Sequence, residues 1–201
     1  MAAALTLGAA AALLFGLSWL GDEARRGIGP RDRYAVRIAD VRCDAPPNTP
    51  RETFLAEVRF AGNLPPTVQA LDPELKPKLE AAFAAHPWVA SVDAVSVEPP
   101  DVVAVALTFR KPALAVPQPT GARAVDAKGV LLPATASTAG LPRLLTPVAL
   151  PPDALAGQLW PGDVVARAAP VAANYKPDTI ESTAQGWELV LPNKQKLTVA
   201  K

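Results

Sequence analysis

The first pattern along the chain is an apolar run from Ala2 to Leu20 that contains no charged residue. Its nineteen residues, at about 1.5 Å per residue in a helix, approach the roughly 30 Å of a bilayer core. Trp19 stands at its end, where membrane helices carry interfacial aromatic residues. The run predicts a transmembrane helix over residues 1–21 and a polar juxtamembrane linker over 22–33. A cleaved signal peptide and a buried core helix are the alternatives.

The orientation of this segment stays open, because its flanking charges conflict with an extracytoplasmic domain. No Lys or Arg precedes the run, and Arg25, Arg26, Arg31 and Arg33 follow it. The positive-inside rule would therefore hold the rest of the chain in the cytoplasm. A longer basic N-terminus, or translocation of the downstream domain despite its flank, would reverse that orientation.

Residues 34–112 mix the period of a strand with the period of a helix. Alternation over 34–42 predicts a strand. A helix follows, with Thr49 as its N-cap, Pro50 in the first helical position and Glu52 completing a capping box. A second helix starts at Asp72 and Pro73. Its apolar face is formed by residues recurring every fourth position, Leu75, Leu79 and Phe83.

Two further strands complete this module. The first contains Val89, Val92, Val95 and Val97, with a phase shift that predicts a bulge between Val92 and Val95. The second has strict period two, at Val103, Val105, Leu107 and Phe109. A turn at 99–101 joins them, and the strand at 34–42 is expected to join the sheet of this hairpin. The order is strand, helix, helix, strand, strand, which predicts a compact α+β domain over 34–112.

Residues 113–201 are dominated by short β-prone runs between prolines, which predict a smaller, mostly β domain. Runs at 122–125 and 130–132 flank a turn containing Gly129. A helix is expected around 163–169. The last strands form a hairpin whose apolar positions are Trp187, Leu189, Leu191, Leu197 and Val199.

The charge balance argues against nucleic acid as a partner. Lys and Arg total 20 and Asp and Glu total 19, so no basic surplus is present to contact phosphates. Hydrophobic residues make up 50% of the chain, which supports packed cores and argues against disorder.

Residues that could perform chemistry are few and scattered. His86 is the single histidine and is expected to cap a helix or lie on the surface. Cys43 is the single cysteine and is expected to be a small buried hydrophobe. Glu98 and Asp101 flank a turn, where carboxylates are usually solvated, and Trp88 is expected to plug a core. We therefore predict no catalytic, cofactor or metal site, no small-molecule substrate and no enzymatic activity.

The stretch HPWVASVDAVSVEPPDVVAVALTFRKPALAV, residues 86–116, carries a resemblance to a known family. The element order of the module is that of a POTRA domain, and the stretch resembles the FtsQ/DivIB family of bacterial cell-division proteins. The matching positions are Pro87, Trp88, Val89, Pro99, Arg110 and Pro112, followed by Ala113. AVDAKGVLLP at 124–133 and LPRL at 141–144 match later family motifs in the same order.

The resemblance implies a non-enzymatic, single-pass protein of the inner membrane with its globular part outside the cytoplasm. Such a scaffold recruits divisome partners of the FtsB/DivIC and FtsL types and helps to control septal peptidoglycan synthesis. Partners bind the family's β domain by strand addition, which makes the closing hairpin a candidate edge. Two departures from the family are a missing basic cytoplasmic tail and a β domain that stops soon after this hairpin.

Two other functions are compatible with parts of the pattern. A POTRA-bearing envelope protein could act in secretion or outer-membrane assembly, but no long run of amphipathic strands remains here for a barrel. A secreted hydrolase or ligand-binding protein would need convergent polar residues, which one histidine and one cysteine do not supply.

Overall fold

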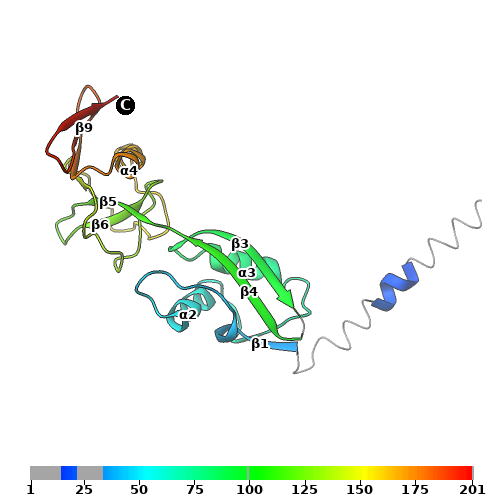
Figure 1. Ribbon diagram of the computed structural model, residues 1–201. Helices are drawn as coiled ribbons and strands as arrows, with labels where there is room; N and C mark the ends of the chain where they lie inside the picture. Colours follow the sequence, from blue (N-terminus) through cyan, green and yellow to red (C-terminus); the bar gives the residue numbers. More distant parts are fainter. Residues whose placement is uncertain (1–14, 22–33, 99, 201) are drawn as a thin grey trace, which may run out of the picture.

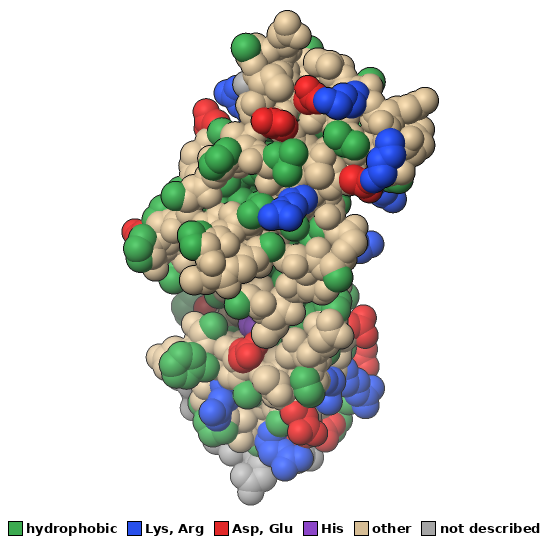
Figure 2. All heavy atoms as spheres, turned by 90° about the vertical axis from the view of Figure 1, so that its left-hand side faces the viewer, with side chains coloured by type: hydrophobic (Ala, Val, Ile, Leu, Met, Phe, Trp, Pro, Cys, Tyr) green, Lys and Arg blue, Asp and Glu red, His purple; other side chains and the backbone are tan. Residues whose placement is uncertain are grey.

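The computed structural model describes residues 15–21, 34–98 and 100–200 as a mixed α+β protein. Two lobes follow one another along the chain (Figure 1). Each lobe is built around its own cluster of buried hydrophobic residues, one within residues 36–105 and one within 114–189. The space-filling view shows a narrower waist between them, with basic and acidic side chains intermixed on that face (Figure 2).

The predicted transmembrane segment falls only partly within the described residues. Residues 15–21 are helical, and the side chains of Phe15, Leu17, Trp19 and Leu20 are exposed. Residues 1–14 and the predicted linker over 22–33 lie outside the described part. Among the helices of the described ranges, none combines the length and hydropathy that a bilayer crossing requires.

The strand predicted over 34–42 is shorter than expected. β1 covers Ala35–Arg37 and ends where a 3₁₀ helix, η2 (Ile38–Asp40), turns the chain. β1 pairs antiparallel with β2 (Thr67–Gln69), a strand that the sequence did not predict. Three residues are too few to establish a period of two, so β2 left no pattern to detect.

The two predicted helices are present, but both begin later than predicted, the second at Leu75 with Glu74 as its N-cap. α2 spans Arg51–Ala61 and α3 spans Leu75–Ala84. The predicted capping box is wrong, because Pro50 has extended geometry (φ −58°, ψ 141°) and no side chain caps the helix. The second helix is preceded by a turn in which Asp72 Oδ1 accepts the amide of Glu74 at 2.9 Å. The helices are joined through their apolar faces, where the rings of Phe54 and Phe83 lie 5.9 Å apart.

The predicted hairpin forms from β3 (Val89–Glu98) and β4 (Val102–Phe109). Register shifts near Val92 confirm the predicted bulge, and Val103 and Val105 face the core as the period required. Pro99, in the turn, lies outside the described residues. The expectation that the strand over 34–42 joins this sheet is met only at Arg42, which bridges Ala104 of β4. β1 itself pairs with β2, and η2 separates it from the hairpin.

The second lobe holds a six-stranded mixed sheet in the order β10-β9-β8-β7-β5-β6. Its strands are β5 (Pro112–Val116), β6 (Arg123–Asp126), β7 (Arg143–Leu144), β8 (Thr179–Ser182), β9 (Trp187–Val190) and β10 (Lys196–Val199). The predicted helix is confirmed and longer, as α4 (Asp163–Tyr175). Its buried face consists of small side chains, Val165, Ala168, Ala169 and Ala172, which let the helix approach the sheet closely.

Candidate interaction site

Three of the residues that carry the family resemblance, Pro87, Trp88 and Arg110, lie where the two lobes meet. Trp88 is 4% exposed and packs in a small cluster with Ala124, Leu132 and Ala136 of the second lobe. The prediction that Trp88 plugs a core is confirmed, and the core in question lies between the lobes. The lack of a side chain at Gly157 lets the two segments come this close, because a Cβ there would lie 3.0 Å from the Cα of Pro87.

An ion pair fixes the chain beside Trp88. The amide of Arg110 donates to the carbonyl of Trp88 at 2.8 Å, and its Nη1 donates to Asp126 Oδ2 at 2.8 Å. Asp126 is 6% exposed, and its other oxygen accepts the amides of Lys128 and Val130, each at 2.9 Å. One carboxylate thus holds both the arginine that follows β4 and the turn that follows β6.

His86 belongs to the same structural assembly, which corrects the expectation of a capping or surface role. It is 4% exposed, and its ring meets the ring of Phe54 edge-on with centroids 4.8 Å apart. Nε2 lies 2.9 Å from Glu57 Oε2, and Nδ1 accepts the amide of Trp88 at 3.3 Å. Both ring nitrogens are engaged in hydrogen bonds, one to the helix α2 and one to the segment that enters the hairpin.

Cys43 is half-buried beside the first core, close to its expected environment. Burial raises the pKa of its thiol, and the nearby Arg51 only partly opposes that effect. A raised pKa disfavours the thiolate, which is the reactive form of cysteine. The described residues also contain no group of three or more His, Cys, Asp or Glu side chains placed to hold a metal ion.

The end strand β10 presents main-chain groups that no described strand pairs. The amide of Leu191 donates to the carbonyl of Gln195 at 2.9 Å, which makes these residues a hydrogen-bonded pair of the β9–β10 ladder. Hydrogen-bonded and non-hydrogen-bonded pairs alternate, so Leu197 also bonds to β9. The N–H and C=O groups of Lys196 and Thr198 therefore point away from β9, towards the outer edge.

The five hydrophobic positions predicted for the closing hairpin lie in different environments. Trp187 and Leu189, in β9, are buried in the core of the lobe, so their side chains face the protein interior. Leu191 and Val199 are half-buried, and Leu197 is 36% exposed. Because β9 lies inside the sheet, β10 is the strand that supplies the edge, and Leu197 is its uncovered apolar side chain.

The opposite end of this sheet is covered by the chain itself. Val125 of β6 forms a bridge with Leu131, and the amide of Leu132 donates to the carbonyl of Ala124 at 2.9 Å. Leu131 is covered in turn by its hydrogen bonds with Gly157 and Gln158. Within the described ranges, β10 is therefore the end of the six-stranded sheet that remains open to another strand.

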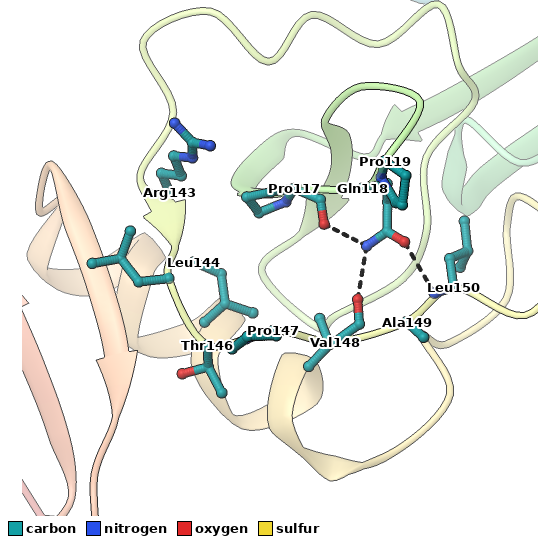
Figure 3. A pocket seen from close by; sticks show the side chains of 11 residues that line it. Pro117, Gln118, Pro119, Arg143, Leu144, Thr146, Pro147, Val148, Ala149 and Leu150 are labelled. Carbon is teal, nitrogen blue, oxygen red and sulfur yellow. Dashed lines mark hydrogen bonds between the residues drawn. The ribbon is translucent and has the colours of Figure 1, made fainter.

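A groove of about 750 Å³ lies near β7, between segments 117–119 and 143–150. Figure 3 shows Gln118 reaching across it: Nε2 donates to the carbonyls of Pro117 and Val148 at 2.6 and 2.9 Å, and Oε1 accepts the amide of Leu150 at 3.0 Å. Arg143 is the one charged residue in its lining. The polar atoms of Gln118 are already hydrogen-bonded to the main chain of the loop. The groove therefore lacks the set of polar groups pointing at one point that a specific small-molecule site has.

Comparison with protein-family models and with curated proteins gives no match to this chain. The candidate site therefore rests on its geometry. It consists of the open strand edge at β10 and of the contacts between the two lobes at Trp88 and at the Arg110–Asp126 ion pair.

Proposed function

We propose that this chain is a non-enzymatic scaffold of the bacterial division machinery, and that it recruits its partners by accepting a strand at β10. The observation that carries the proposal is the outward orientation of the Lys196 and Thr198 main-chain groups beside the exposed Leu197. A partner strand satisfies those groups by hydrogen bonding, and its side chains then cover Leu197.

The resemblance in residues 86–116 names the class of partner, which is a small membrane protein of the FtsB/DivIC type acting together with an FtsL-type protein. The proposed anchor is the apolar segment over 1–21, and the proposed location of the lobes is outside the cytoplasm, on the inner membrane. The contacts of Trp88 and of Arg110 with Asp126 suit a scaffold, because they join the lobe that carries β10 to the rest of the chain.

The proposal predicts that a fluorescent fusion of the chain forms a mid-cell band in dividing cells of its own species. Thr198→Pro deletes one outward amide, and the ladder with β9 does not use that amide, so the band should weaken while the protein remains folded. Thr198→Val keeps the amide and serves as the matched control. A uniform envelope signal for the wild-type fusion would overturn the division role. A protease-protection assay on spheroplasts tests the side of the membrane independently.

A further inference from the structure

A pocket of about 680 Å³ lies at one end of the six-stranded sheet, in the second lobe. Three parallel strands, β5, β7 and β8, begin at this end, and the segments that enter them line the pocket, at 111–113, 140–142 and 176–178. The end of α4 lines another part of it, at Ala172 and Ala173. The volume falls within the range of about 300–1,000 Å³ that is usual for ligand pockets.

The short strand β7 explains why a pocket forms beside β5. β7 begins at Arg143, which pairs with Ala115, so the first residues of β5 extend beyond it. The register of β5 with β6 also shifts between Pro112 and Leu114, which places a bulge at Ala113. Pro112 and Ala113 therefore line the pocket instead of pairing with β7.

The uncharged part of the lining is apolar and poor in hydrogen-bond donors. Its side chains belong to Pro, Ala, Leu and Gly alone. Proline, which has no amide to donate, occupies four of the positions, 112, 142, 177 and 192. These walls suit an apolar ligand of small cross-section, and any anionic group on that ligand needs its donors from elsewhere.

Two lysines at this pocket supply such donors. Lys111 and Lys176 line it and are exposed. Neither has an ion pair or a side-chain hydrogen bond with any residue that the structure describes. The remaining charged residue of the lining, Asp178, is paired with Lys194 at 3.1 Å. Two uncompensated ammonium groups beside apolar walls are complementary to an apolar group that carries a carboxylate.

The end of α4 adds a hydrogen-bond acceptor. Lys176 has left-handed geometry (φ 46°, ψ 51°), and its amide donates to the carbonyl of Ala172 at 2.9 Å. The next carbonyl, that of Ala173, would take the amide of residue 177, but Pro177 has none. No described donor bonds to the Ala173 carbonyl. A ligand with an N–H group close to its carboxylate satisfies this carbonyl and the lysines together, and an alkyl acid does not.

We infer that this pocket binds the C-terminal residue of a partner peptide. The carboxylate lies beside Lys111 and Lys176, the N–H of the terminal residue donates to the Ala173 carbonyl, and its small apolar side chain contacts the Pro and Ala walls. Capture of a C-terminal carboxylate is a recurring mode of peptide recognition. The inference does not depend on the division role, and the pocket uses none of the main-chain groups of β10.

NMR titration of the full chain in detergent, followed through its backbone amides, tests this inference. The probe is acetyl-Leu-Ala with a free C-terminal carboxylate, and the control is the same peptide with a C-terminal amide. The free acid should shift the amides of Ala113 and Lys176, and it should bind at least about tenfold more tightly than the control. The same acid methylated at the nitrogen of its Ala lacks the N–H for Ala173 and should bind about fivefold more weakly.

Substitutions at exposed side chains test the role of the lysines without disturbing the core. Lys111→Gln combined with Lys176→Gln should reduce the affinity for the free acid to that of the amide control and leave the amide control unchanged. Lys128→Gln is the matched control variant, because Lys128 is exposed beside Ala127 but does not line the pocket. It should bind the free acid as the wild type does.

Four results would overturn the inference: no shift at Ala113 and Lys176, equal affinity for the free acid and the amide control, an equal loss of affinity in Lys128→Gln, or equal affinity for the acid with and without its N–H. Octanoate that binds at the same amides as tightly as acetyl-Leu-Ala would replace the peptide end by a fatty acid and would also overturn it. The proposed function is judged by the mid-cell band and by Thr198→Pro, so either proposal can fail alone.

Discussion

Arg110 and Asp126, sixteen residues apart in sequence, form an ion pair of 2.8 Å in which both side chains are largely buried. The pair joins the segment leaving β4 to the end of β6, next to the Trp88 contact between the lobes. The ion pair and the hydrophobic contact of Trp88 therefore lie side by side where the two lobes meet.

Replacing Asp126 with Ala should destabilise the protein by about 3–5 kcal/mol, because Arg110 is then left buried without a counter-charge. The same change removes the acceptor for the amides of Lys128 and Val130. Urea unfolding followed by tryptophan fluorescence measures the loss. Asp40→Ala is the control, because the Arg37–Asp40 pair is exposed and exposed pairs contribute little. Equal midpoints for the two variants would contradict the structural role of the pair.

Val105→Asp should unfold the first lobe. Val105 is 4% exposed within the core, and a buried, unpaired carboxylate costs roughly 3 kcal/mol or more. The neighbouring Ala106 points to solvent, so Ala106→Asp should change the melting temperature far less. Circular dichroism on both variants makes the comparison. Similar melting temperatures for the two variants would show that Val105 does not face the core and Ala106 does not face solvent.

The stability of the turn before α3 should depend on the ionisation of Asp72. Its pKa is lowered mainly by the hydrogen bond from the amide of Glu74, with Lys78 adding to the effect. A group whose folded-state pKa is depressed stabilises the fold above its unfolded pKa and loses that contribution as the pH falls through the folded-state value. Asp72→Ala should therefore cost at most about 1 kcal/mol at pH 7.

The pH dependence of this cost provides the check. Urea midpoints of the wild type and Asp72→Ala should converge as the pH falls below about 4, the range in which an unperturbed Asp protonates. A difference that stays constant from pH 7 to pH 2 would show that the carboxylate charge has no part in holding the turn.

The Cys43 thiol should react slowly with a disulfide reagent at pH 8. Burial raises its pKa, so less thiolate is present in the folded protein than in an unfolded chain at the same pH. The rate of thiol modification, measured with and without denaturant, should rise when the protein unfolds. The rise should be larger than the one measured for a surface cysteine under the same two conditions. A folded-state rate equal to that of free cysteine would contradict this environment.

The sequence predicted the elements whose pattern is local and long enough to read. The alternation in β4 and the four-residue spacing in α3 each placed buried residues correctly, including Val105 and Leu79. β2 and η2 were missed because three residues carry no period. The helix start at Thr49 was misread because Pro50 stays extended, a backbone choice that the capping pattern does not determine.

The features of the site that were missed depend on distant parts of the chain. The burial of His86 comes from Phe54 and Glu57, which lie a helix away. The pairing of Arg110 with Asp126 requires β5 and β6 to be adjacent. Only the strand order shows that β10, and not β9, ends the sheet, because β9 pairs with β8 on its other side.

The central claim is that the outward main-chain groups of β10 hold a partner strand. Hydrogen exchange at Thr198 tests it most directly, measured on the free protein and on a complex purified from dividing cells with its membrane partner. The account predicts that the Thr198 amide exchanges at least about tenfold more slowly in the complex, since a strand that pairs with β10 occupies that amide. Equally rapid exchange at Thr198 in both samples, with the partner still bound, would contradict it.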